Sequence, residues 1–272
     1  MTKGETNGMD ISRRTRLKGL DLFSGIGGIA QALEPWVETV AYCDNDPAAQ
    51  TILTSRMGRG EIEVAPIWDD VTTLTADQLP AIDLVAGGFP CQDISVSGAG
   101  RGLAGQRSGL FFEVARLVRE LRPKFVFLEN VSAISKRGGP QVIATLAEMG
   151  YRVRWGDLSA KAVGATHTRA RWWCLAYSNE AYVERRGSCS GLSPQYISDG
   201  QSLHQVDRRP PGPDSDQWEQ LLQAEPRMQP AIYRTDVGVS NWKHRNGALG
   251  NSVDAPTAQA AFKKLIGLES TV

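Results

Sequence analysis

Short apolar runs alternate with amphipathic stretches across residues 17–175, and this alternation limits the fold more than any other feature. Buried strands separated by helices are typical of a doubly wound, mostly parallel sheet, so we predict an α/β fold. In such sheets, ligands bind beyond the carboxyl ends of the strands. The predicted strands are residues 18–23, 38–43, 82–86, 125–129, 152–158 and 171–177, and the predicted helices are residues 29–33, 47–57, 110–121, 140–149 and 254–266.

The character of the sequence changes after Ser178. Residues 179–245 hold six of the fourteen prolines and show little periodicity. They are either a long disordered insertion or a small irregular domain, and periodicity alone does not decide between them. In the last predicted helix, Asp254 is a possible N-cap and Pro256 lies in the first turn. The polar residues 1–17 are expected to form a flexible terminal tail.

The composition is that of an ordinary globular protein, with 41% hydrophobic and 22% charged residues. No apolar run is long enough to cross a membrane and no signal-peptide core is present, so we expect a cytoplasmic location. None of the four cysteines forms a Cys-x-x-Cys pair, so we expect neither a metal site nor disulfides. A net charge of zero is unusual for a nucleic-acid-binding protein, although a local basic cleft would suffice.

A glycine-rich turn at residues 24–28 follows the first predicted strand. Its glycines permit a sharp turn and a close approach of ligand, but such a turn also occurs without any ligand. Asp44 and Asp70 favour a ligand, because carboxylates near the next two strand ends can accept from ribose hydroxyls and from an adenine amino group. No phosphate-binding lysine follows the glycines. A nucleoside without phosphates therefore fits better than a triphosphate.

Cys91 lies on a loop among Gly87, Gly88 and Pro90. A lone cysteine is usually a small buried residue, whereas a thiolate on such a loop can act as a nucleophile. Glu129 ends the strand at residues 125–129 and is either a salt-bridged surface group or an acid. In a dry pocket its carboxyl group would stay protonated and could donate to a ring nitrogen.

Three motifs together resemble the C5-cytosine DNA methyltransferase family: Asp21-Leu22-Phe23-Ser24-Gly25-Ile26-Gly27-Gly28, Phe89-Pro90-Cys91-Gln92 and Glu129-Asn130-Val131. The resemblance extends from about Leu20 to Ala258, which is most of the chain. It implies the Rossmann-like fold of class I methyltransferases. It also implies that Cys91 adds to C6 of a flipped-out cytosine in duplex DNA, while Glu129 acts at N3.

The same resemblance implies S-adenosylmethionine as the cofactor. The family usually has Glu rather than Asp at position 44, and residues 250–253 match its last motif. The implied cofactor-binding residues are Phe23, Gly25, Ile26, Gly28, Asp44, Asn45, Asp70, Val71, Pro90, Leu110, Asn251, Ser252 and Val253.

Residues 167–171 resemble the Gln-x-Arg-x-Arg motif of the family, with His167 in place of Gln. Arg169 and Arg171 alternate along the chain and so point to one face of a strand. An apolar run follows them, which indicates a central strand with the arginines lining a cleft. The resemblance implies that Arg171 contacts cytosine O2 and steadies Glu129, and that Arg169 supports the site and a nearby phosphate.

The loop at residues 92–109 is expected to be a lid that closes over a flipped base, although a plain surface loop has a similar composition. Its candidate DNA contacts are Gln92, Ser95, Ser97, Arg101 and Arg107.

The resemblance implies a DNA (cytosine-5)-methyltransferase of phage or restriction-modification origin, acting as a nucleoid-associated monomer on double-stranded DNA. A tRNA cytosine methyltransferase is the first alternative. Those relatives usually show Pro-Pro-Cys-Gln-Pro, whereas this chain has Phe89 before Pro90. A catalytically inactive DNA-binding regulator is the second, and the intact Cys91 and Glu129 argue against it. We expect residues 18–178 and 246–272 to form the catalytic domain and residues 179–245 to read the target sequence.

Overall fold

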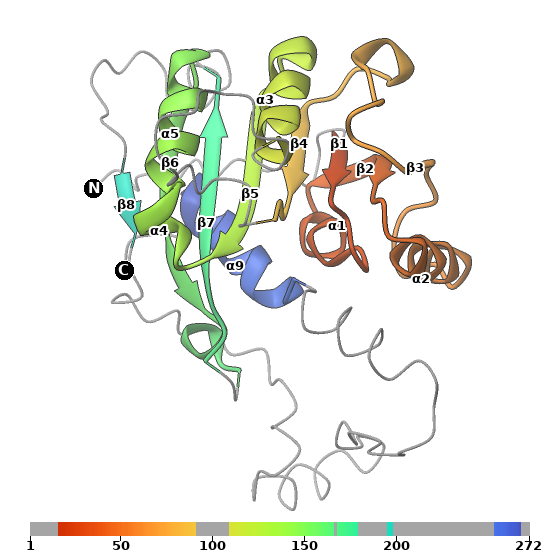
Figure 1. Ribbon diagram of the computed structural model, residues 1–272. Helices are drawn as coiled ribbons and strands as arrows, with labels where there is room; N and C mark the ends of the chain where they lie inside the picture. The colour runs from red at the N-terminus through yellow and green to blue at the C-terminus, as the bar shows by residue number, and fades with distance from the viewer. Residues whose placement is uncertain (1–15, 91–108, 166–167, 179–194, 198–252, 268–272) are drawn as a thin grey trace, which may run out of the picture.

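The computed structural model describes residues 16–90, 109–165, 168–178, 195–197 and 253–267. These residues form an eight-stranded sheet in the order β3-β2-β1-β4-β5-β7-β6-β8 (Figure 1). Only β7 runs antiparallel to its neighbours in this described sheet, so the predicted α/β fold with a mostly parallel sheet is confirmed. The strands are β1 (Leu17–Leu22), β2 (Val37–Cys43), β3 (Ile67–Trp68), β4 (Leu84–Gly87), β5 (Phe125–Val131), β6 (Arg152–Ser159), β7 (Ala170–Tyr177) and β8 (Gln195–Ile197).

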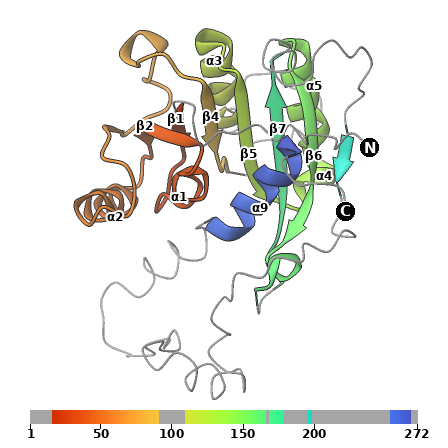
Figure 2. The same cartoon turned by 180° about the vertical axis from the view of Figure 1, so that it is seen from behind.

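Helices cover both faces of the sheet. One face carries α3, α4 and α5, and the other carries α1 and α9, with α2 beside them (Figure 1). Figure 2 shows α9 crossing that second face over β7 and β6. The helices are α1 (Gly28–Leu33), α2 (Pro47–Gly58), α3 (Leu110–Leu121), α4 (Ile134–Arg137), α5 (Gly139–Glu148) and α9 (Ala255–Ile266), with short 3-10 turns η2 (Ala76–Gln78) and η4 (Lys161–Val163).

The central strands are apolar on both sides because both faces are covered. Along β5, Val126 and Leu128 pack toward α3 and α5, while Phe127 packs toward α9. The Phe127 ring stacks on Trp173 at a centroid distance of 5.5 Å and meets Phe262 edge-on at 5.3 Å. These aromatic contacts fix α9 to the middle of the sheet.

The ends of α9 follow the sequence prediction. Asp254 is its N-cap and accepts a hydrogen bond from the Thr257 backbone N–H at 3.1 Å. Gly267 closes the helix with a φ of 70°, a left-handed conformation that glycine adopts without strain.

All six predicted strands and five predicted helices are present, with ends shifted by a few residues. Phe23 was expected in the first strand but lies in the turn after β1, where its φ is 53°. Leu17 and Arg16 were assigned to the tail, yet Leu17 begins β1 and Arg16 forms an ion pair with Glu63 at 2.7 Å. Residues 195–197 form β8 beside β6, so this part of the expected recognition region extends the sheet.

Asp21 is a buried acid in β1, with only 2% of its surface exposed. Neither carboxylate oxygen has a hydrogen-bond partner among the described residues, and a cavity of about 10 Å³ lies beside it, between β1 and α1. Burial, and secondarily repulsion from Asp44, raise the pKa of Asp21 from 3.8 to about 8. The Ala30 backbone N–H, which falls short of hydrogen-bond geometry, lowers the pKa of Asp21 and only partly offsets burial. Asp21 therefore carries a proton at neutral pH.

This proton makes stability depend on pH. Between the unfolded pKa of 3.8 and the folded pKa of about 8, folding takes up a proton, so stability falls as pH rises through this window. The slope approaches about 1.4 kcal/mol per pH unit. Asp21→Asn keeps the shape without the charge. We expect this variant to have a higher free energy of unfolding than the wild type in urea at pH 8. At pH 5 the increase should be much smaller.

Asp69→Asn is the matched control, because Asp69 is exposed. It should leave the difference between pH 5 and pH 8 close to that of the wild type. Identical pH profiles for the wild type and Asp21→Asn would contradict the assignment of a buried, protonated Asp21.

Candidate functional site

The candidate residues gather at one edge of the sheet. The carboxyl ends of the parallel strands β1, β2, β4 and β5 meet there, and the segments that follow them begin at Phe23, Asp44, Gly88 and Ser132. Because β7 is antiparallel, its first residues lie at the same edge, and Arg171 pairs with Val131. The sheet order thus brings together motifs that are far apart in the sequence.

The glycine-rich turn leaves β1 in strained backbone. Gly25 and Gly27 have φ values of 54° and 80°, and Phe23 adopts 53°, which is costly for a bulky residue. Ser24 secures the turn by donating from its hydroxyl to the Asp21 carbonyl at 2.7 Å, and the Cys43 backbone N–H donates to that hydroxyl at 3.2 Å. A Cβ on Gly25 would meet no atom of the described residues within 4 Å, which leaves space for a ligand on that side of the turn.

Asp44 lies directly against this turn. Its Oδ2 accepts from the Gly25 backbone N–H at 2.7 Å, and its Oδ1 accepts from the Asp46 backbone N–H at 2.9 Å. Asp46 in turn caps α2 by accepting from the Ala48 backbone N–H. The carboxylate is therefore fixed in place, and each oxygen keeps a lone pair for a ligand hydroxyl. Asn45 follows as an exposed residue.

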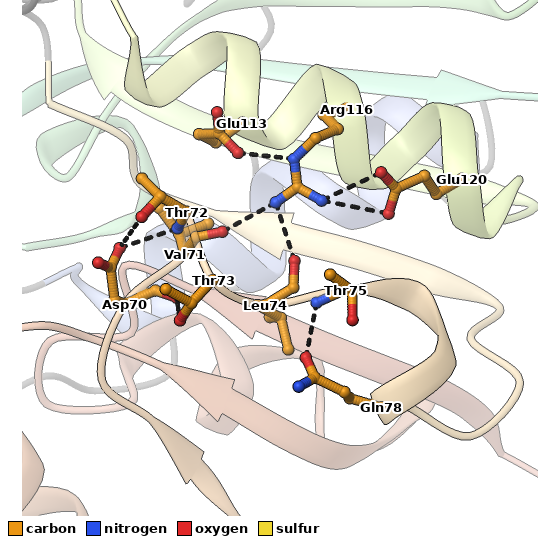
Figure 3. Close-up of polar contacts among 10 residues, drawn as sticks. All are labelled: Asp70, Val71, Thr72, Thr73, Leu74, Thr75, Gln78, Glu113, Arg116 and Glu120. Carbon is orange, nitrogen blue, oxygen red and sulfur yellow. Dashed lines mark hydrogen bonds and ion pairs between the residues drawn. The ribbon is translucent and has the colours of Figure 1, made fainter.

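Asp70 begins the turn after β3 (Figure 3). Its Oδ1 accepts from the Thr72 backbone N–H at 2.8 Å and from the Thr72 hydroxyl at 2.7 Å. These hydrogen bonds lower the pKa of Asp70, so it is ionised at neutral pH. Because Oδ1 takes both bonds, Oδ2 can accept from an amino group. Val71 is buried in the apolar cluster against which Phe23 and Leu110 also pack.

Val253 joins the glycine turn to the catalytic candidates. A Cβ on Gly28 would lie 2.6 Å from the Val253 carbonyl oxygen, so a side chain there would displace the backbone of residue 253. A Cβ on Gly88 would lie 3.9 Å from Val253 and 3.1 Å from Glu129 Oε2. Residues separated by more than 220 positions in the sequence therefore meet at one point.

Glu129 is buried in β5, two residues before the strand ends, and pairs with Arg171. The Arg171 Nε lies 2.8 Å from Glu129 Oε1, across two antiparallel strands. Burial raises the pKa of Glu129, and the charges of Arg171 and Arg169 only partly offset it. Burial, and secondarily the Arg171 charge, lower the pKa of Arg169. The site thus holds a carboxyl group that can keep a proton and a cation that orients it.

Asn130 anchors the segment that leads to Cys91. Its side-chain amide donates to the Phe89 carbonyl at 2.8 Å, and its oxygen accepts from the Val131 backbone N–H at 2.8 Å. Phe89 also packs on Phe111 of α3, with ring centroids 5.5 Å apart. No role for Asn130 was predicted, although its position next to Glu129 at a strand end was a usable signal.

Two other cysteines are poor nucleophiles. Burial raises the pKa of Cys43 to about 12 and also raises that of Cys174. A thiol with such a pKa carries almost no thiolate at neutral pH.

Pro90, an exposed residue, precedes Cys91, which lies outside the described residues. The same holds for the other candidates in the gaps: Gln92, Ser95, Ser97, Arg101, Arg107, His167, Asn251 and Ser252. Within the described ranges, no group of three His, Cys, Asp or Glu residues could hold a metal ion. Within those ranges, too, every helix is too short or too polar to span a membrane.

Residues 17–223 match the family model described as C-5 cytosine-specific DNA methylase. The chain is 36% identical over 159 residues to the Type II methyltransferase M.CviJI of Paramecium bursaria Chlorella virus IL3A, covering 58% of this chain and 42% of the relative. It is 31% identical over 175 residues to the Type II methyltransferase M.HhaI of Haemophilus parahaemolyticus, covering 62% of this chain and 52% of the relative. The chain thus spans about half the length of the curated relatives it matches.

Solved structures show the same fold. A crystal structure of a Spodoptera frugiperda DNMT2 mutant superposes with a TM-score of 0.55 at 20% identity, covering 72% of this chain and 57% of that one. A putative DNA modification methyltransferase encoded within an E. coli prophage gives a TM-score of 0.50 at 24% identity, covering 61% and 48% of the two chains. The predicted Rossmann-like fold of class I methyltransferases is confirmed.

Proposed function

Because the chain belongs to the C-5 cytosine-specific DNA methylase family, we propose that it methylates C5 of cytosine in double-stranded DNA. The observation that carries this proposal is the buried Glu129, which is held by Arg171 and lies adjacent to Gly88. Gly88 is three residues before Cys91 in the sequence. An acid of raised pKa beside the loop of a candidate nucleophile suits addition to an electron-poor ring. The description of the family as a C-5 cytosine-specific DNA methylase supports DNA as the substrate.

The residues present fit S-adenosylmethionine. The open glycine turn leaves space for the methionine part beside Phe23, Gly25 and Ile26. Asp44 would accept hydrogen bonds from the ribose hydroxyls. Asp70 would accept a hydrogen bond from the adenine amino group, and Val71 and Leu110 would pack against the adenine. When bound, this cofactor supplies an electrophilic methyl group on a sulfonium.

The chain's own residues activate the cytosine. The Cys91 thiolate would add to C6, and Glu129 would donate its proton to N3, which makes C5 nucleophilic. Arg171, which already orients Glu129, would donate a hydrogen bond to cytosine O2. Once C5 carries the methyl group, the C5 proton leaves to solvent water, the C6–S bond breaks with its electron pair on sulfur, and N3 returns its proton to Glu129. These steps restore the ring and the free thiolate.

Residues 179–245 would choose the target sequence, because they lie between the two-arginine motif and the closing motif at residues 250–253. The candidate contacts to bases and phosphates are Arg185, Arg186, Arg208, Arg209 and Arg227. The loop after Cys91 would close over the flipped base. Acting on duplex DNA as a monomer, the protein would be found with the nucleoid of a bacterium or of a phage-infected cell.

The nucleophile is tested by Cys91→Ser. Transfer of a labelled methyl group to duplex DNA should fall to background, since an alcohol is far less ionised than a thiol. Cofactor binding should survive. DNA that contains 5-fluorocytosine should trap a covalent complex with the parent protein alone.

Cys174→Ala is the control, since that thiol is fully buried in the apolar core between the sheet and helices α3 and α5. It should retain both transfer and trapping. Robust turnover by Cys91→Ser would contradict the covalent mechanism. Transfer to tRNA with none to duplex DNA would contradict the proposed substrate, and cofactor binding without transfer to either would favour an inactive regulator.

The cofactor pocket is tested by calorimetry on two neighbouring carboxylates. Asp70→Ala should weaken S-adenosylmethionine binding by about 1–3 kcal/mol, because it removes an acceptor of an adenine hydrogen bond. Asp69→Ala, a change at an exposed neighbour, should leave the affinity unchanged. Asp44→Ala should weaken binding through the ribose, and Asp44→Glu should be mild. Unchanged affinity in both Asp70→Ala and Asp44→Ala would refute this placement.

A further inference from the structure

Arg116 of α3 connects that helix to the turn after β3 (Figure 3). Its Nη2 donates to the carbonyls of Val71 at 3.0 Å and Leu74 at 2.8 Å, which are 45 and 42 residues earlier in the chain. On its other sides, the guanidinium is held by Glu113, at 2.7 Å from Nε, and by Glu120, at 3.1 and 3.2 Å from Nη1. A planar fork held in this way can bind two carbonyls in one fixed orientation.

The turn depends on an outside donor. Residues 70–74 make a single helical turn, in which the backbone N–H groups of Thr73 and Leu74 donate to the Asp70 carbonyl at 3.1 and 3.2 Å. The last carbonyls of a helical turn have no partner within it. Val71 and Leu74 are buried, so water could not easily take the place of Arg116 as the donor to their carbonyls. Arg116 satisfies both carbonyls at once.

This same turn carries both residues assigned above to the adenine. Asp70 starts it, with its carboxylate fixed by Thr72, and Val71 follows in the apolar cluster. Leu110, the third adenine candidate, begins the helix that carries Arg116. A shift of the turn relative to α3 would therefore move Asp70 and Val71 away from Leu110.

We propose that Arg116 is a positioning residue for cofactor recognition: it fixes the turn at residues 70–74 against α3 and so sets the selectivity for an adenine base. This inference rests on the proposed function, in which the pocket binds an S-adenosyl cofactor. A purely structural cluster of Arg116, Glu113 and Glu120 would support folding and leave base selectivity unchanged. The two roles therefore differ in a measurable way.

The test compares two ligands by calorimetry on the full chain. One is S-adenosylhomocysteine, and the other is S-inosylhomocysteine, which lacks the amino group that would donate a hydrogen bond to Asp70. The wild type should prefer the adenosyl compound by about tenfold or more, the equivalent of one good hydrogen bond. In Arg116→Met, adenosyl affinity should fall at least about tenfold and the preference should approach one. Arg116→Lys should be intermediate, since an ammonium cannot form the same fork.

Arg119→Met is the matched control, because Arg119 is an exposed residue of the same helix. It should keep both the affinity and the preference. In methyl transfer, Arg116→Met should raise the KM for S-adenosylmethionine and leave kcat at saturation close to that of the wild type. If Arg116→Met does not fold, Arg116→Lys, which keeps a charge between the two glutamates, provides the same comparison.

Failure of the proposed function and failure of the role of Arg116 give different results. A wild type that binds neither ligand contradicts the proposed function itself. A wild type with the expected preference, together with a folded Arg116 variant that keeps this preference, overturns only the role of Arg116. A wild type that binds both ligands equally also overturns it, because no selectivity then remains for the turn to set.

Discussion

The pairing of β7 with β5 is the constraint on which the candidate site depends. The register sets Arg171 opposite Val131 and Trp173 opposite Glu129, so Arg171 and Glu129 are diagonal neighbours on one face. A slip of one residue would turn Arg171 to the other face and leave a buried carboxylate without its cation. The stack of Phe127 on Trp173 and the packing of Phe262 against it hold this register from the α9 side. The chemistry at the edge thus depends on apolar packing in the middle of the sheet.

In the described part of the chain two acids are buried, with different consequences. Glu129 meets Arg171 at the edge of the sheet, where a ligand can share its proton. Asp21 lies deeper, beside a small cavity, and burial keeps it protonated. It sits just before the strained turn at Phe23 and Gly25, whose backbone is held by Ser24 and Asp44. Strain at such a turn persists only when its surroundings over-determine it, and here the close contact of Gly28 with Val253 adds to that restraint.

Much of the fold followed from the sequence because its signals are local. Alternating apolar runs marked the long strands, and Asp254 with Pro256 marked the start of α9. The short strands β3 and β8 were missed, since two or three residues cannot establish a period. In the site, Glu129 and Arg171 were identified from motifs. Asn130 and Arg116 were not assigned, because each acts on backbone carbonyls more than 40 residues away, and such contacts leave no local pattern.

The central claim is that this sheet edge activates a cytosine ring at C5, and one doubly labelled reaction tests it most directly. Duplex DNA with tritium at cytosine C5 is incubated with the protein and with S-adenosylmethionine that carries a radiocarbon methyl group. Addition of Cys91 at C6, with Glu129 acting at N3, predicts one tritium released to water for each methyl group transferred. Methyl transfer with the tritium retained, as in methylation of the exocyclic amino group, would contradict it.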